Sequence, residues 1–123
     1  MTLDFENFLE SSSYKEIYKI LLNYVKEKGN DKKSLTRAMG SLKNYRIVGS
    51  NTFRKIINFN GDNGNTLLHH AVIDGHTNSI TILFKYGANF LIENNVSKIP
   101  LNLAQEQYTK NVLIEGMKKQ FTA

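Results

Sequence analysis

Residues 64–76 read Gly-Asn-Thr-Leu-Leu-His-His-Ala-Val-Ile-Asp-Gly-His, and this stretch decides the fold. The hydroxyl of Thr66 is placed to cap a helix that begins at the next residue, and His69 can bond within the same turn. Gly75 follows the apolar run and supplies the left-handed backbone conformation that commonly ends helices. The stretch therefore predicts a short helix at 67–74.

A second short helix is predicted directly after it, at 77–86. Thr77 or Asn78 can cap its start, and Gly87 is placed to stop it. Two short helices joined by a tight glycine turn cannot bury their apolar faces alone, so this layout is typical of a helical repeat array.

Apolar residues recur at helical spacing along the rest of the chain. In 14–28 they fall at i, i+3, i+4, i+7 and i+8: Ile17, Ile20, Leu21, Tyr24 and Val25. Further helices are predicted at 34–43, 52–59, 100–107 and 109–119, with a short amphipathic segment at 3–9. Ser34 is the expected cap of one, and Pro100 suits the first turn of another. The expected fold class is all-α.

A 33-residue step relates 64–94 to the segment that follows it. The step places Thr66 on Ile99, Leu67 on Pro100, Leu68 on Leu101, His69 on Asn102 and Ala71 on Ala104. The stretch 64–76 resembles the ankyrin-repeat signature G-x-T-P-L-H-x-A-x-x-x-G-H, and Ile80, Leu83, Phe84, Gly87 and Ala88 match its later part. One step backward, Leu68 falls on Leu35 and Ala71 on Ala38, with the turn glycine and histidine lost.

The resemblance implies a single ankyrin-repeat domain, a helical solenoid of about four helix pairs whose terminal units diverge because they need a polar outer face. Its expected units are an N-terminal helical cap at 1–30, a diverged repeat at 31–60, the best-matched repeat at 61–94 and a C-terminal capping repeat at 95–123. Leu68, Ile80, Leu83 and Phe84 are expected in the layer between neighbouring units.

The length and composition of the chain exclude several classes of protein. The 123 residues suit one domain, and the absence of cysteine excludes disulfides and thiolate metal sites. No apolar stretch reaches the roughly 18 residues that cross a bilayer, and the acidic start lacks the features of a signal peptide. We therefore expect a cytoplasmic protein, or one delivered into a host cell by a non-classical export route.

Positive charge is concentrated in residues 26–55, where nine Lys and Arg stand against two acidic residues. Solvated helix faces explain such a block, but it could also bind nucleic acid or an acidic surface. The candidate basic patch is Lys32, Lys33, Arg37, Lys43, Arg46, Arg54 and Lys55.

No catalytic, cofactor or metal motif is present in the sequence. His69 and His70 are adjacent on a predicted helix and point about 100° apart, so they would not easily share one ion. The segment 61–66 is similar in composition to part of a calcium loop but lacks the ligand spacing and the closing Glu. We expect neither an enzyme nor a metalloprotein, and no cofactor.

Ankyrin repeats bind other proteins through their turn tips and the inner face of their first helices, so the resemblance implies a protein partner. Ile73, an apolar residue at an expected exposed position, either binds that partner or packs on a neighbouring helix; Tyr86 is an interface anchor or an ordinary surface residue. The implied partner-binding residues are Asp62, Asn63, Asn65, Ile73, Asp74, Tyr86, Asn95, Val96, Lys98, Glu106 and Gln107.

Overall fold

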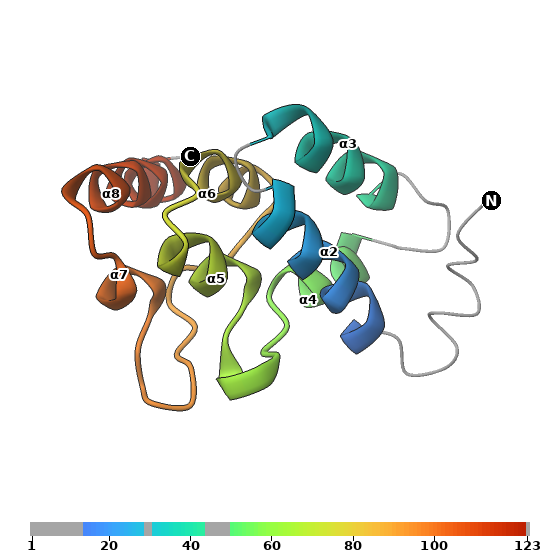
Figure 1. Cartoon of the computed structure of the whole chain (residues 1–123), viewed down its shortest axis with the longest axis horizontal. Helices are drawn as coiled ribbons and strands as arrows, with labels where there is room; N and C mark the ends of the chain where they lie inside the picture. The colour runs from blue at the N-terminus through green and yellow to red at the C-terminus, as the bar shows by residue number, and fades with distance from the viewer. Residues whose placement is uncertain (1–13, 29–30, 44–49, 123) are drawn as a thin grey trace.

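The computed structural model describes residues 14–28, 31–43 and 50–122, and every regular element in these ranges is helical, with no strand. This confirms the expected all-α class. The segment expected at 3–9 lies outside the described residues. In chain order the elements are α2 (Tyr14–Lys28), α3 (Lys32–Lys43), α4 (Ser50–Ile57), a 3-10 turn (Asp62–Gly64), α5 (Leu67–Ile73), α6 (Thr77–Lys85), α7 (Pro100–Leu103) and α8 (Gln107–Thr122) (Figure 1).

The helices form two rows. In one row α2 lies against α5 and α5 against α7; in the other α3 lies against α6 and α6 against α8 (Figure 1). The rows meet where α2 packs on α3 and α5 packs on α6, while α4 contacts both α2 and α3. The connections that precede α5 and α7 extend away from the rows as two neighbouring loops (Figure 1). The arrangement leaves the loop tips on one side and the α3–α6–α8 row on the other.

This helix order corrects the expected repeat register. Placing Leu35 in the position of Leu68 would make α3 the neighbour of α5. Instead α2 lies beside α5, and α3 lies beside α6. The expected boundary at residue 30 therefore divides two helices that pack on each other. Ile17, Leu21 and Val25 recur every four residues along α2 and are buried, so one side of α2 contributes to the core that it shares with α5.

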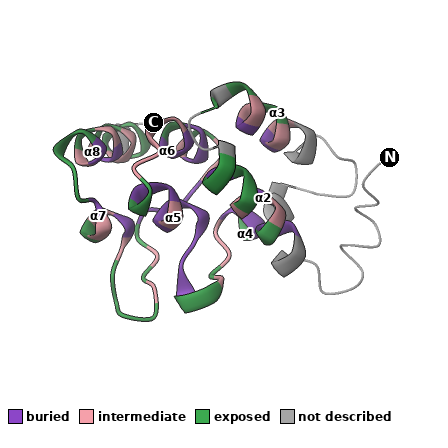
Figure 2. Ribbon diagram, in the orientation of Figure 1, coloured by how far each residue is buried: buried purple, intermediate pink, exposed green. Residues whose placement is uncertain are grey.

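The core runs through both rows (Figure 2). Leu68, Ile80 and Leu83, which were expected to be buried, are almost completely inaccessible to solvent. Phe84 is only partly buried and packs on this core from its edge. Tyr24, expected on the apolar side of α2, is instead 37 % exposed.

Both ends of α5 have the cap and the glycine turn that the local sequence predicted. The backbone N–H of His69 donates to the Thr66 hydroxyl at 3.4 Å, the capping geometry expected at the start of the helix. Gly75 and Gly87 have φ values of 68° and 97°, the left-handed conformation predicted to end α5 and α6. A side chain at either position would strain the backbone, so these glycines set where each helix ends.

Other helix ends differ from the expectation. α3 begins at Lys32, and Asp31 acts as its cap by accepting hydrogen bonds from the Ser34 backbone N–H at 3.2 Å and the Ser34 hydroxyl at 2.8 Å. His76, not Thr77 or Asn78, occupies the N-cap position of α6. The Asp31 carboxylate, three residues before Ser34, offers two oxygens to the first turn, whereas Ser34 offers a single hydroxyl.

Of the last two helices, the first begins where predicted and ends earlier, and the second begins two residues earlier than predicted. Pro100 is the first residue of α7, where its missing N–H costs nothing. α7 ends at Leu103 because Ala104 adopts an extended conformation, and α8 begins at Gln107. α4 likewise begins at Ser50, two residues earlier than predicted.

Within the ranges given above, no helix combines the length and the apolar character that crossing a membrane requires.

Candidate functional site

Two turns, at 58–66 and 89–99, are tied together by a series of hydrogen bonds. The Asn95 backbone N–H donates to the Asn63 carbonyl at 2.9 Å, and the Asn94 side-chain amide donates to the Asn65 side-chain oxygen at 3.0 Å. Within the first turn, the Asn60 side-chain amide donates to the Gly64 carbonyl at 2.7 Å. The tips of the two turns therefore lie side by side in a preset geometry.

Backbone conformation at these turns depends on asparagine and glycine. Asn63, Gly64 and Ser97 have positive φ, at 61°, 74° and 60°. A Cβ on Gly64 would lie 2.8 Å from the Asn95 backbone nitrogen. Asparagine tolerates this region better than most residues do, and only glycine allows the close approach. This explains why the Asn/Gly-rich segment forms the predicted turn.

His69 joins α5 to both turns. Its Nδ1 accepts a hydrogen bond from the Thr66 backbone N–H at 3.0 Å, so the proton of the neutral ring sits on Nε2, which donates to the Lys98 carbonyl at 2.9 Å. Burial lowers the pKa of His69, against the raising effect of the Lys98 carbonyl. The bond to Thr66 was expected from the sequence; the bond to Lys98, 29 residues away, was not.

Tyr18 supports the first turn from α2, a role that no local sequence signal predicted. Its hydroxyl donates to the Asn65 carbonyl at 2.8 Å. A Cβ on Gly61 would collide with the Tyr18 ring, which shows how closely the turn approaches α2. Burial, with a smaller contribution from the Asp62 carboxylate, raises the pKa of Tyr18 to about 12.

The first exposed group, which we call the tip surface, comprises five of the predicted partner-binding residues. All five are exposed, and Val96 is 69 % exposed. The members of the tip surface are Asp62, Asn63, Asn95, Val96 and Lys98.

The second exposed group, which we call the loop surface, comprises Ile73, Asp74, Glu106 and Gln107 together with Tyr108. Ile73 is 43 % exposed, so packing on a neighbouring helix does not bury it, and its role in partner binding stays a prediction. Gly75 lies against the Thr109 side chain, so the α5–α6 turn and the start of α8 are neighbours. Tyr108 is 67 % exposed and was missed as a site residue, although an aromatic residue where the repeat pattern has glycine was its signal.

Two predicted partner-binding residues are less accessible than expected. Asn65 is only 9 % exposed, and its side-chain oxygen accepts a hydrogen bond from the Asn94 side chain, so Asn65 helps to hold the two turns together. Tyr86 is partly buried and packs against the core, and its hydroxyl would lie 3.8 Å from a Cβ on Gly40 of α3. Turn composition and helix position alone do not distinguish these residues from exposed neighbours.

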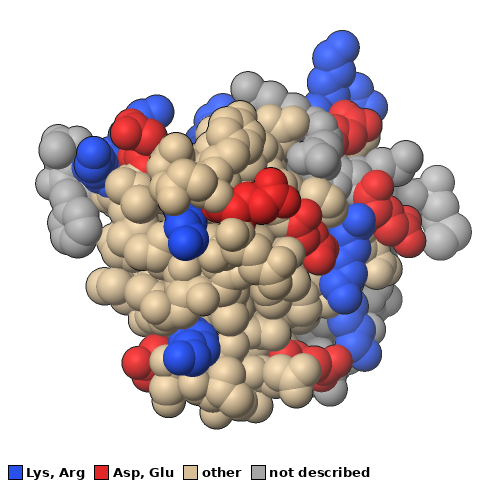
Figure 3. Space-filling model, turned by 60° about the vertical axis from the view of Figure 1, so that its left-hand side comes forward, with Lys and Arg blue, Asp and Glu red and all other residues tan. Residues whose placement is uncertain are grey.

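The basic patch is only partly described. Lys33 and Arg37 are exposed on α3, and Arg54 and Lys55 are exposed on α4, which contacts α3. The side chains of Lys32 and Lys43, and the whole of Arg46, lie outside the described residues. On the face that Figure 3 shows, charged side chains of both signs are scattered around a broad uncharged area.

His69 and His76 form contacts that hold neighbouring segments of the fold together. His76 Nδ1 lies 2.8 Å from the Val25 carbonyl, and both ring nitrogens of His69 are engaged as described above. Burial and the nearby Lys26 lower the pKa of His70. The described residues contain no group of three His, Cys, Asp or Glu side chains able to hold a metal ion.

Comparison with known proteins returned no matching family model, no matching curated protein and no matching solved structure.

Proposed function

We propose that this chain is a non-catalytic protein-interaction module of the ankyrin-repeat type, which occupies a partner's surface through its tip and loop surfaces. The main support is the combination of exposed apolar side chains with a hydrogen-bonded frame. Val96, Ile73 and Tyr108 offer anchors that a partner would cover. The bonds from His69 and Asn94 hold the turns before binding, so little ordering cost is added on association.

The charges around these anchors define the rim of the proposed interface. The loop surface carries two carboxylates, on Asp74 and Glu106, beside its apolar residues. The tip surface carries Asp62 and Lys98 around Val96. Charges on the rim of an interface affect the association rate and the choice of partner more than they affect affinity.

The experiment is a pull-down from source-cell lysate with the tagged full chain, with and without nuclease, read by mass spectrometry. One dominant protein that survives nuclease is the expected result. Ile73→Asp combined with Val96→Asp should weaken its capture at least tenfold, since both changes place a charge in an apolar contact.

The matched control is Tyr24→Asp, which puts the same charge on an exposed apolar residue of α2 outside both surfaces. Thermal melting followed by circular dichroism checks that each variant is folded. Equal capture by the double variant and the wild type would refute the proposal.

A second candidate is binding of nucleic acid or an acidic surface through the basic patch. Its support is the exposure of Lys33, Arg37, Arg54 and Lys55 on two helices in contact. Captured proteins that disappear on nuclease treatment, with an affinity for single-stranded RNA that falls steeply with salt, would favour it over the first proposal.

A further inference from the structure

A second candidate docking site lies away from the turns, on the row formed by α3, α6 and α8. Between α6 and α8 the surface is hollowed by a groove of about 520 Å³ with a mostly apolar lining. Phe84 of α6 and Val112 and Gly116 of α8 supply its apolar part. Gly116 lets the Phe84 ring lie directly against α8, since a Cβ there would lie 2.5 Å from that ring.

The length of the groove fits a helix. Its α8 edge extends from Asn111 to Gln120, which at 1.5 Å per residue is about 14 Å, or two and a half helical turns. A helix with apolar side chains at i, i+4 and i+7 spans about 10 Å along one face. Such a segment could place three apolar side chains along the groove.

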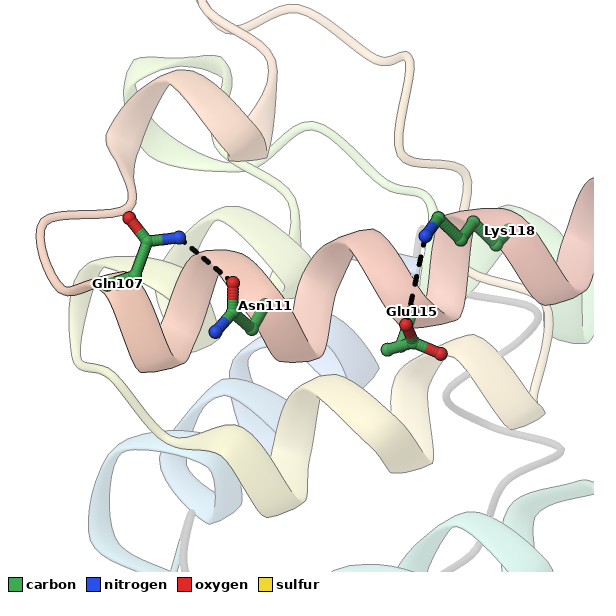
Figure 4. A network of polar contacts seen from close by, with 4 residues as sticks. All are labelled: Gln107, Asn111, Glu115 and Lys118. Atoms are coloured by element: carbon green, nitrogen blue, oxygen red, sulfur yellow. Dashed lines mark hydrogen bonds and ion pairs between the residues drawn. The ribbon is translucent and has the colours of Figure 1, made fainter.

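Several uncharged polar groups on the rim are already bonded. The Thr81 hydroxyl donates to the Thr77 carbonyl at 3.1 Å, and the Gln120 side chain donates to the Ala88 carbonyl at 3.1 Å. The Asn111 side-chain oxygen accepts from Gln107 at 2.9 Å (Figure 4). The charged groups on the rim add a further basis for choosing a partner.

The charge of the rim is positive. Lys85 stands on the α6 side and Lys119 on the α8 side, and both residues are exposed. Against these two cations the lining holds one carboxylate, on Glu115, which lies 4.0 Å from the Lys118 ammonium group (Figure 4). An occupant that carries carboxylates beside its apolar stripe complements this distribution.

We propose that the α6–α8 groove docks an acidic amphipathic helix of a partner protein. Its apolar side chains lie over Phe84, Val112 and Gly116, and its carboxylates face Lys85 and Lys119. This site is separate from the tip and loop surfaces and does not depend on their proposed role.

The test uses the full chain and a fluorescein-labelled stapled helical peptide with leucines at i, i+4 and i+7 and glutamates beside them. Fluorescence anisotropy should give saturable binding. Lys85→Glu combined with Lys119→Glu should weaken it about tenfold or more. Lys19→Glu combined with Lys26→Glu, which lowers the net charge equally at exposed positions of α2, should change it less than about twofold.

Amide chemical shifts locate the peptide independently. Shifts concentrated at residues 81–85 and 111–120 are the expected result. A peptide with lysines in place of the glutamates should bind at least tenfold more weakly. No binding, equal loss in the two double variants, equal binding of the lysine peptide, or shifts elsewhere would each overturn the proposal.

Discussion

The Nε2 atom of His69 lies 2.9 Å from the carbonyl oxygen of Lys98, so one side chain in α5 holds the turn that precedes α7. The same ring accepts a hydrogen bond from the Thr66 backbone N–H, which places it between two consecutive turns. Because the ring is completely buried, removing it leaves polar backbone groups without partners as well as a cavity.

His69→Ala is therefore expected to lower the free energy of unfolding by about 2–4 kcal/mol. The matched control is Asn102→Ala, which falls on the same repeat position and loses one hydrogen bond, to the Ile99 backbone N–H, at an exposed site. That change should cost about 0.5–1.5 kcal/mol. Urea denaturation of both variants measures the difference, and equal losses would show that the link to Lys98 is unimportant.

Stability should fall as the solution is acidified. Burial lowers the pKa of His69, and burial with Lys26 nearby lowers that of His70, below the ordinary value of 6.5. Between the folded and unfolded pKa values the unfolded chain binds more protons, so the free energy of unfolding decreases as pH falls below about 6.5.

Urea midpoints at pH 7.5 and pH 5.5 measure this dependence. In His69→Gln the decrease should be smaller than in the wild type, and the part due to His70 should remain. An identical decrease in the two proteins would mean that His69 is not the titrating group.

Leu68→Ala tests the core between the helix rows. Leu68 is 1 % exposed in α5, and truncating it should cost about 2–5 kcal/mol by leaving a cavity. Leu91→Ala removes the same atoms from a side chain that is 60 % exposed and should cost well under about 1 kcal/mol. Thermal melting of the two variants compares them, and an unchanged melting temperature for Leu68→Ala would refute the burial.

Two glycines within helices should respond oppositely to alanine. At Gly40 in α3 the nearest atom to a new Cβ is the Tyr86 hydroxyl at 3.8 Å, so Gly40→Ala should stabilise the chain by about 0.5–1 kcal/mol through helix propensity. At Gly116 the new Cβ would lie 2.5 Å from the Phe84 ring, and the expected cost is about 1–3 kcal/mol despite the same gain in propensity.

The rescue experiment combines Gly116→Ala with Phe84→Leu, which makes room for the added methyl group. Stability of the double variant should exceed the sum expected from the single changes, as measured by a double-mutant cycle. Strict additivity would mean that Phe84 is not the group Gly116 accommodates.

Local signals predicted most of the helices and several of their ends. Thr66, Gly75 and Gly87 act through the backbone within a few residues of their own positions, so their roles follow from neighbouring sequence. Capping by Asp31 was missed because two polar residues close together compete for one helix start, and the sequence does not rank them.

The candidate site was only partly predictable. The repeat pattern predicted that Ile73 and Val96 are exposed, and both are exposed in the structure. The same pattern predicted exposure for Asn65 and Tyr86, which are less accessible to solvent. Tyr108 was overlooked because exposure of an aromatic residue depends on what packs over it, and no spacing rule contains that information.

By itself, then, the sequence determined the all-α class, the turns at 58–65 and around residue 94, and the capped start and glycine end of α5. Only the tertiary structure decided that α2, and not α3, lies beside α5, that His69 reaches Lys98, and that Phe84 packs directly on Gly116. The physical reason is the sequence distance over which each kind of interaction acts. Caps, turns and helical periodicity act over a few residues, whereas burial and helix pairing depend on which distant segments exclude water from each other.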